Sequence, residues 1–372
     1  MIASVAVALG PSTANAQSLA WPAAGSAARS APDGIVAGQP QIFIPEDEAA
    51  RISDLDVPAG KPVDATGVST ALDEYWTPER MEEAIPMDVP STDIDVSTQR
   101  APQSGRSALD AVAEQATNAL DLLDLAALPV ADVEPRPAPY ASNGVAPANG
   151  RIFFTTEDGS KLTCSGSAVN SPSGNVVSTA AHCVHGGKGK GFHRNWVFRP
   201  NYVLGISTGA FQPKQFYIPE YWKTNGVNTN TGAAVLDSDV AFVATFNDSN
   251  GQSLVDRVGG HGLRTSGSLA FPAKIFGYPV NNLTLGNSQS TCSGDTSTDQ
   301  LDGFDYVGLP CSMGPGASGG PWLADYNPSN GYGYIRTISS GGGTASDGNN
   351  WILAPSFDSR AWDLYQAASS GL

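Results

Sequence analysis

The second half of the chain alternates short β-prone runs with turn-forming residues, and this pattern constrains the fold more than any other feature. From Arg151 onward charged residues become sparse, aromatic residues appear, and Gly, Asn and Ser separate the runs. Short strands at such spacing are typical of an all-β sandwich or barrel. The expected strands are Arg151–Thr156, Asn175–Thr179, Trp196–Arg199, Ala233–Leu236, Val240–Phe246, Lys274–Gly277 and Gly333–Ile338.

Two other stretches of this half differ from the strand pattern. Residues 185–230 are rich in Gly, Asn, Lys and aromatic residues, which indicates long loops between strands. Helical character returns only at Ser359–Ala368, so we expect a single closing helix.

The front third of the chain differs from the rest in charge. Residues 17–140 carry a net charge of −14, whereas residues 141–372 carry −2. Neither part has the basic face that nucleic-acid binding requires, so no nucleic-acid partner is expected. The contrast predicts an acidic pro-region over residues 17–140 and a separate domain over residues 141–372.

Local structure within the acidic part is expected to be sparse. Its first stretch, residues 17–70, has the composition of a disordered or extended segment. Thr77-Pro78-Glu79 predicts a helix start, because Thr caps and Pro fits the first helical position. Apolar spacing over Ser107–Leu128 also suggests a helix, and the Pro-rich stretch Leu128–Ala148 predicts a linker. A folded helical cap and a solvated acidic tail both stay open.

The N-terminus resembles a secretory signal. Residues 1–16 contain the apolar run Ile2–Leu9 and end on Ala14-Asn15-Ala16, which fits an A-x-A cleavage site. The usual basic start is missing, which leaves open a truncated or misassigned start. No other apolar run approaches the length that spans a bilayer. We therefore expect a secreted, extracellular protein without a membrane span.

A glycine-rich loop around Ser318 is the strongest candidate for chemistry. The stretch Cys311–Trp322 reads CSMGPGASGGPW, and glycines let such a loop aim backbone N–H groups inward beside a hydroxyl nucleophile. One alternative is an ordinary Gly/Ser/Pro surface loop without a catalytic role. The G-x-S-x-G nucleophile elbow of α/β-hydrolases is another, but that order requires a His after the Ser. All four histidines precede Ser318, which favours the order His, Asp, Ser.

Two upstream motifs complete that order. Thr179-Ala180-Ala181-His182-Cys183 follows a strand-like run, and Asp239 begins another within Asp237-Ser238-Asp239-Val240-Ala241-Phe242-Val243. Together with GxSGGP they resemble the chymotrypsin-like, or trypsin-fold, serine peptidases. The resemblance covers residues 145–372 and implies a chymotrypsin-like double six-stranded β-barrel with a C-terminal helix.

Further motifs narrow the resemblance to secreted bacterial enzymes related to the V8-like glutamyl endopeptidases. These motifs are Cys164-Ser165-Gly166, Phe276-Gly277-Tyr278-Pro279, Gly308-Leu309-Pro310-Cys311, SGGPW and Trp362–Ala368. Upstream, the short piece Tyr75–Met81 is similar to a segment found in the pro-regions of such enzymes.

The resemblance implies a role for each candidate catalytic residue. Ser318 is the nucleophile, His182 the general base and then acid, and Asp239 the group that orients the imidazole. Asp237 is the rival of Asp239, although the family places its Asp two residues before an apolar pair, which favours Asp239. The backbone N–H groups of Gly316 and Ser318 are expected to form the oxyanion hole.

The chain departs from the family pattern at several positions. Ala317 replaces the Asp that pairs with a new N-terminus in trypsin-like enzymes, so Arg151-Ile152 is interpreted as strand rather than as an activation site. Ser312 replaces a charged pocket base, and the strand after the serine lacks the His of glutamyl endopeptidases. Neither Arg/Lys nor Glu specificity is therefore indicated. The residues expected to bind substrate are Ser312, Ser339, Ser340 and Gly341.

The four cysteines admit three pairings, and their even number with a secretory signal favours disulfides. The family resemblance favours Cys164–Cys183, and we expect Cys292–Cys311 to brace the approach to Ser318. A metal site of His182, Cys183 and His185 is the weak rival, since no C-x-x-C pair supports it. No metal or cofactor is expected.

The combined expectation is a secreted serine endopeptidase made as a precursor. It hydrolyses polypeptide substrates through His182, Asp239 and Ser318, and its own pro-region is the expected inhibitor. The expected organisation is a signal peptide at 1–16, a pro-region with linker at 17–140, and a peptidase domain at 141–372. The alternative is a non-catalytic binding protein with the same fold, which loss of a triad residue would indicate.

Overall fold

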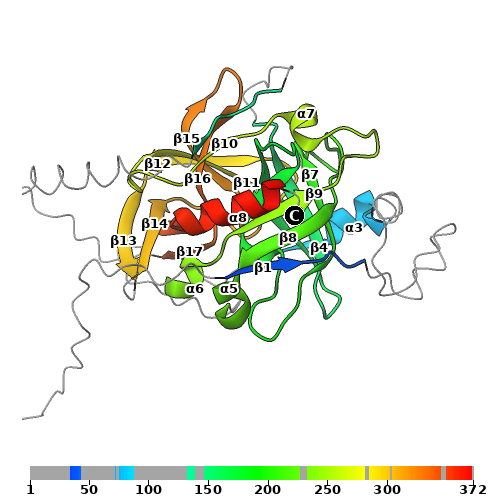
Figure 1. Ribbon diagram of the computed structural model, residues 1–372, viewed down its shortest axis with the longest axis horizontal. Coiled ribbons are helices and arrows are strands. Elements are labelled where there is room, and N and C mark those ends of the chain that lie inside the picture. The colour runs from blue at the N-terminus through cyan, green and yellow to red at the C-terminus, as the bar shows by residue number, and fades with distance from the viewer. Residues whose placement is uncertain are drawn as a thin grey trace, which may run out of the picture. The chain divides into compact units, whose positions relative to one another are not determined.

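The computed structural model describes residues 34–42, 72, 75–87, 132–138, 146–226, 233–280, 285–301, 304–344 and 349–370. In this part of the chain strands dominate, and a long helix closes the fold (Figure 1). The all-β fold class with a C-terminal helix is thus confirmed. No helix among the described residues has the length and apolarity needed to cross a membrane.

The first half of the domain expected at residues 141–372 is one antiparallel barrel sheet. Its strand order is β8-β9-β6-β5-β4-β7, and a bridge between Phe198 and Phe211 joins β7 to the start of β8. The strands are β4 (Asn149–Thr155), β5 (Lys161–Val169), β6 (Val176–Thr179), β7 (Arg194–Pro200), β8 (Pro213–Pro219) and β9 (Ala241–Thr245).

Residues from the front third extend this sheet at two places. Strand β1 (Ile35–Gly38) pairs antiparallel with β8, and β2 (Ile85–Pro86) pairs parallel with β5. A stretch expected to be disordered or extended therefore contains a strand. An exposed sheet edge offers unpaired N–H and C=O groups, and such an edge accepts any extended segment with a free backbone.

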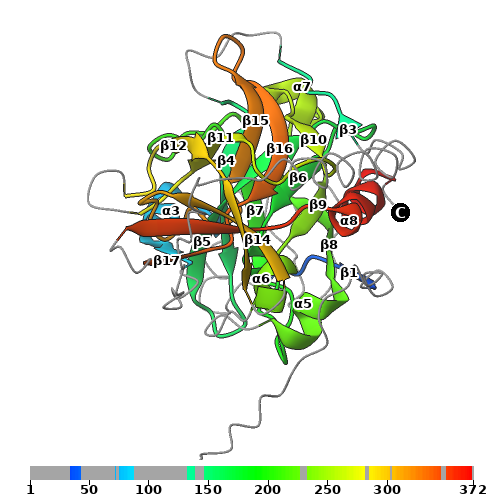
Figure 2. The same ribbon diagram turned by 90° about the vertical axis from the view of Figure 1, so that its left-hand side faces the viewer.

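The second half consists of two sheets (Figure 2). They share one apolar cluster. One sheet runs β12-β11-β15-β16-β10-β3 and the other β13-β14-β18-β17. The strands are β3 (Asp132–Val133), β10 (Gly262–Arg264), β11 (Pro272–Gly277), β12 (Ser290–Asp295), β13 (Ser297–Leu301), β14 (Phe304–Pro310), β15 (Pro321–Asn327), β16 (Tyr332–Ile338), β17 (Gly341–Thr344) and β18 (Asn350–Pro355).

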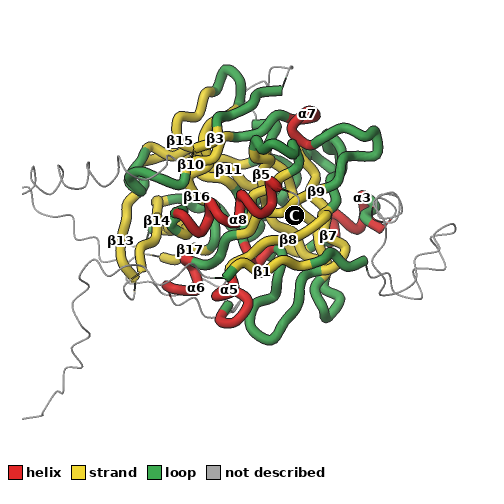
Figure 3. The backbone as a smooth tube through the Cα atoms, in the orientation of Figure 1, coloured by secondary structure: helices red, strands yellow, loops and turns green. Residues whose placement is uncertain are grey.

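Among the described residues, the helices are short apart from the last one (Figure 3). They are α3 (Pro78–Glu83), the 3-10 turn η1 (Ala181–Cys183), α5 (Glu220–Asn225), α6 (Ala233–Asp237), α7 (Leu254–Val258) and α8 (Ser359–Ser370). Helix α8 packs against β8 and β9, where the ring of Tyr365 lies 5.8 Å from that of Phe242. The closing helix packs over the first barrel and fixes the end of the chain there.

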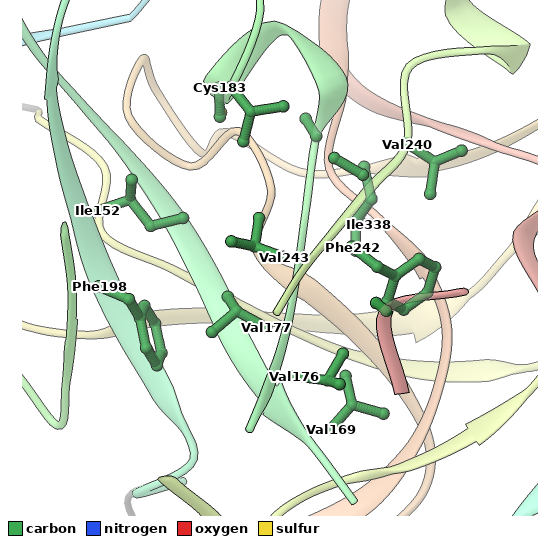
Figure 4. Close-up of a cluster of buried hydrophobic side chains, with 14 of the residues drawn as sticks. Ile152, Val169, Val176, Val177, Cys183, Phe198, Val240, Phe242, Val243 and Ile338 are labelled. Atoms are coloured by element: carbon green, nitrogen blue, oxygen red, sulfur yellow. The ribbon is translucent and has the colours of Figure 1, made fainter. Parts of the chain in front are cut away.

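The largest apolar cluster fills the first barrel and reaches the second half. Figure 4 shows Ile152, Val177, Val243 and Phe198 from neighbouring strands, with Ile338 from β16 beside them. Each of these side chains is completely buried. Burying one such side chain contributes about 1.5–3 kcal/mol to stability, so the cluster fixes how the two halves meet.

Most of the expected strands are confirmed, and one is wrong. β4, β6, β7, β9, β11 and β16 match their predicted runs within two residues. Ala233–Leu236 lies instead in helix α6. A short apolar run cannot distinguish strand from buried helix by periodicity, and Ala and Leu are good helix formers. The stretch expected to be long loops, residues 185–230, also contains β8 and α5.

The helix start at Thr77 is confirmed. Thr77 Oγ1 accepts a hydrogen bond from the N–H of Arg80 at 3.3 Å, and Pro78 occupies the first turn. The helix expected at Ser107–Leu128 and the signal at residues 1–16 lie outside the described residues.

Part of the expected linker is built into the second half. Within Leu128–Ala148, β3 pairs with β10, and the Asp132 carboxylate binds the Arg264 guanidinium at 3.1 Å. The Pro-rich composition indicated a linker because Pro cannot continue a helix or a central strand, yet two residues suffice for an edge strand.

Both expected disulfides are present. Cys164 in β5 is bonded to Cys183 at the end of η1, and Cys292 in β12 to Cys311 after β14. The first ties the strand beside Ser318 to the turn that carries His182. Each bridge closes a loop of about 20 residues, which chain-entropy reasoning values at about 3 kcal/mol.

Candidate active site

His182 and Asp239 meet at the edge of the first barrel. His182 lies in η1 just after β6, Asp239 lies just before β9, and these two strands are neighbours in the sheet. The His182 Nδ1 atom is 2.6 Å from Asp239 Oδ2, and the His182 backbone N–H donates to Oδ1 at 2.8 Å. Both residues are buried. This geometry assigns the imidazole proton to Nδ1 and leaves Nε2 as the basic nitrogen.

Ser340 supplies a third donor to the Asp239 carboxylate. Its hydroxyl Oγ bonds to Asp239 Oδ2, and its side chain is buried. Sequence analysis placed Ser340 among the substrate-binding residues and missed this contact. No local signal could have revealed it, because the two residues are far apart in the sequence.

Asp237 has a different environment from Asp239. Its Oδ2 atom pairs with the Arg360 guanidinium, and its Oδ1 accepts the Ser356 N–H at 3.1 Å. Burial raises the pKa of Asp237, and the nearby Arg360 charge opposes that rise. Asp237 therefore links α6 to α8, whereas Asp239 faces the imidazole.

The loop that carries Ser318 is held by both halves of the domain. The Ser318 carbonyl accepts the Ser165 N–H at 2.7 Å, and the Gly319 N–H donates to the Ser339 carbonyl at 2.6 Å. Gly319 has a φ of +82°, and a side chain there would come within 2.3 Å of the Ser165 carbonyl. Only glycine fits this close approach.

Ser318 lies next to the turn of His182. The Cys183 Sγ atom is 3.7 Å from the Ser318 carbonyl oxygen. The Nε2 atom of His182 is buried and has no hydrogen-bond partner among the described residues. A buried imidazole nitrogen without a partner is unfavourable and calls for an explanation such as a catalytic role. The Ser318 backbone thus lies beside the turn that carries His182, and His182 is paired with Asp239.

The expected oxyanion donor Gly316 has a partner from the front third. Its N–H donates to the Met87 carbonyl at 3.4 Å, and its φ of +91° is accessible to glycine. The contact with Met87 is a second feature that sequence analysis missed.

A cavity of about 330 Å³ opens beside Ser318. It is lined by Met87, Cys311, Ser312, Met313, Gly314, Pro315, Ala317, Ser318, Ser339, Ser340, Gly341, Gly342, Gly343, Asn350, Trp351 and Ile352. Every expected substrate-binding residue is in this lining, and none of the lining side chains carries a charge. The Ser339 hydroxyl already accepts the Trp322 Nε1–H at 3.0 Å. The free lining is therefore mostly backbone, apolar groups and the exposed Ser312.

The Ala317 side chain packs against its neighbours and is not open to a new N-terminus. It is buried, and a side chain at Gly277 would lie 3.1 Å from its Cβ. Without a carboxylate at this position, the loop geometry depends on the contacts of Ser165 and Ser339 described above.

The sulfur atoms near His182 do not offer a thiolate metal site. The ligand atoms of Cys164, His182 and Cys183 lie within 4.8 Å of one another. The two sulfurs are bonded to each other, however, and a metal prefers a free thiolate.

Two buried histidines make folding sensitive to acid. Burial lowers the pKa of His193 to about 4 and that of His261 to about 3. Both imidazoles stay neutral in the folded protein, whereas in the unfolded chain they take up a proton near pH 6.5. The contribution of these two histidines to the free energy of unfolding is therefore fully present above pH 6.5 and is lost as the pH drops toward 4.

We expect His193→Gln to weaken this pH dependence. The His193 Nε2 atom lies 3.0 Å from the His182 carbonyl, and a Gln amide can keep that bond. Denaturant unfolding between pH 6.5 and 4.5 should show a slope reduced by about 1.4 kcal/mol per pH unit. Lys214→Gln, at an exposed position, is the control and should keep the parent slope. An unchanged slope in His193→Gln would mean that His193 is protonated in the folded state.

Comparison with known proteins gives bacterial proteases. The structure of protease Anisep from Arthrobacter nicotinovorans matches with 31% identity and a TM-score of 0.52, over 62% of this chain and 98% of that one. The thermostable serine protease AL20 from an extremophilic microorganism matches with 28% identity and a TM-score of 0.52, over 60% and 98%. A Glu endopeptidase structure matches with 20% identity and a TM-score of 0.47, over 64% and 97%. No family model matches the chain, and no curated protein matches it.

Proposed function

Since the chain belongs to the chymotrypsin-fold serine peptidases of bacteria, we propose that it is a secreted serine endopeptidase made as a precursor. Ser318 attacks the substrate carbonyl, and His182 takes the serine proton and later gives it to the leaving amine. Asp239 holds the imidazole in the required tautomer and stabilises its cation. The acyl-enzyme on Ser318 is then hydrolysed by water.

The observation that carries this proposal is the pairing of His182 with Asp239. Two hydrogen bonds join them, at 2.6 and 2.8 Å, and the buried Nε2 atom of His182 has no partner among the described residues. The Gly316 N–H donor beside Ser318 supplies the charge stabilisation that acyl transfer needs.

The cavity beside Ser318 supports a preference for neutral side chains. Its lining has no charge to pair with Lys, Arg, Asp or Glu. Burying an unpaired substrate charge there would cost several kcal/mol, whereas an apolar side chain gains about 25 cal/mol per Å². We therefore place an uncharged, apolar residue on the acyl side of the cleaved bond.

Covalent labelling tests the function directly. The chain is incubated with casein, with and without a small fluorophosphonate, and the labelled peptide is identified by mass spectrometry. Loss of casein cleavage together with a label on Ser318 is the expected result. Ser318→Ala is the control, which should neither cleave nor take the label. A folded chain that never cleaves and never labels would be a non-catalytic member of the fold.

Processing is expected to remove the front third upstream of Asp132. β3 pairs with β10, and the exposed ion pair of Arg136 with Asp256 at 2.7 Å ties the next residues to α7. A start between Asp132 and Arg151 would strip β3 from its sheet. N-terminal sequencing of active enzyme from the medium should therefore find a start between Met87 and Asp132. A start downstream of Asp132 would contradict a retained β3.

A further inference from the structure

Strand β2, from the front third of the chain, ends at the candidate active site, where Met87 follows it. Strand β2 pairs parallel with β5, and the Met87 N–H donates to the Thr163 carbonyl at 2.9 Å. Met87 is 4% exposed and shares the cavity lining with Ser318. Its carbonyl oxygen accepts a hydrogen bond from the Gly316 N–H and therefore occupies the donor that a substrate carbonyl would use.

An aromatic anchor holds the same segment at a second place. The Trp76 ring lies 5.4 Å from the Phe153 ring, and its Nε1–H donates to the Asn195 carbonyl at 2.6 Å. The Tyr75 hydroxyl lies 3.1 Å from Thr155 Oγ1. Tyr75 and Trp76 are 2% and 1% exposed. They pack in one apolar cluster with Phe153, Val197, Tyr202 and Tyr278.

Helix α3, labelled in Figure 1, lies between the anchor and β2 along the chain. Met81 and Ala84, on its buried side, belong to the same apolar cluster as Trp76. Glu82 and Glu83 lie on its exposed side. The Arg80 guanidinium donates to the Tyr75 carbonyl at 2.8 Å and closes the turn between anchor and helix. A short capped helix fixes the spacing between Trp76 and Met87, so the two contacts act as one unit.

We propose that residues 75–87 are an autoinhibitory segment, and that the apolar surface of Phe153, Val197, Tyr202 and Tyr278 is the docking surface that recruits it. Trp76 gives the segment its affinity, and Met87 blocks the Gly316 donor. This inference rests on the proposed peptidase activity. Two separate contacts give the segment a higher effective concentration at the cleft than β2 alone would have.

The test measures how fast a small fluorophosphonate labels Ser318 in the full-length, uncut chain. Intact mass spectrometry reports label and chain length together, so processed enzyme does not enter the rate. Trp76→Ala should label about 30-fold faster than the parent, since truncating a buried aromatic anchor commonly costs this much affinity or more. Glu82→Gln, on the exposed side of α3, is the matched control and should label at the parent rate.

A second variant and a peptide cover the case in which Trp76→Ala fails to fold. Replacing both Pro86 and Met87 with Gly loosens β2 and leaves the anchor intact, and it should also label about 10-fold or more faster than the parent. A synthetic peptide of residues 75–87 should slow labelling of a folded Trp76→Ala chain, and the same peptide without its Trp should not.

The outcomes separate this inference from the proposed function. If the parent, Trp76→Ala and the double Gly variant all label Ser318 at one rate, the peptidase proposal stands and the autoinhibitory segment is refuted. If no folded form labels Ser318 at all, the peptidase proposal itself fails.

Discussion

Ser318→Ala is expected to lower kcat for peptide hydrolysis by about 10⁶-fold, and His182→Ala by a similar factor. The hydroxyl forms the covalent bond and the imidazole moves its proton, so neither works without the other. The double variant should be little worse than either single one, because such residues act as a unit. The measurement is kcat on one short peptide substrate with an apolar residue before the cleaved bond.

Two controls make this result specific. Thermal unfolding of Ser318→Ala should match that of the parent, since Ser318 is held through its backbone carbonyl and not through its hydroxyl. Ser165→Ala is a matched serine variant of the same region. It removes the hydroxyl that donates to the Gly316 carbonyl at 2.7 Å and should reduce activity much less. Full proteolysis by Ser318→Ala would end the serine-peptidase interpretation.

Asp239→Asn is expected to lower kcat by about 10⁴-fold, as a carboxamide in this position favours the wrong imidazole tautomer. The Asp239 Oδ2 atom now accepts from His182 Nδ1, whereas an amide NH₂ group would donate to it. The loss should appear in kcat more than in KM, because substrate does not contact Asp239. Steady-state kinetics on the same peptide measures both.

Asp237→Asn is the matched control two residues away. It should keep kcat within a few fold. It should lower the free energy of unfolding by about 2 kcal/mol, because it breaks the charge-assisted bond with Arg360, whereas the pair of Arg360 with Asp358 stays. If Asp237→Asn loses activity and Asp239→Asn does not, the two aspartates have been assigned the wrong way round.

Local patterns in the sequence predict much of the fold for a clear reason. Strands such as β4, β9 and β16 appear as β-prone runs between turns, and the helix start at Thr77 needs only its own neighbours. The motifs around His182, Asp239 and Ser318 are equally local. Ala233–Leu236 shows the limit of such reasoning, because a run of four apolar residues fits either a strand or a buried helix turn.

Hydrogen-bond partners that lie far apart along the chain could not be predicted from the sequence. The hydroxyl of Ser340 reaches Asp239 across 101 positions, and the Asp237 pair with Arg360 spans 123. Nothing in either local segment encodes these distances, because loop packing between the two halves sets them. The same holds for Trp76 and Met87. Their partners, the Asn195 carbonyl and the Gly316 N–H, lie far away in the sequence.

The sequence by itself determined the strand class, the order His182, Asp239, Ser318, and the residue types that a serine peptidase needs. Those properties follow from short-range backbone preferences and from side-chain chemistry. The tertiary structure alone decided which aspartate faces the imidazole, which serine supports it, and that Met87 occupies the Gly316 donor. Hydrogen bonds form only within about 3.5 Å, and the packing of β-barrel sheets and their loops is what brings such distant residues within that range.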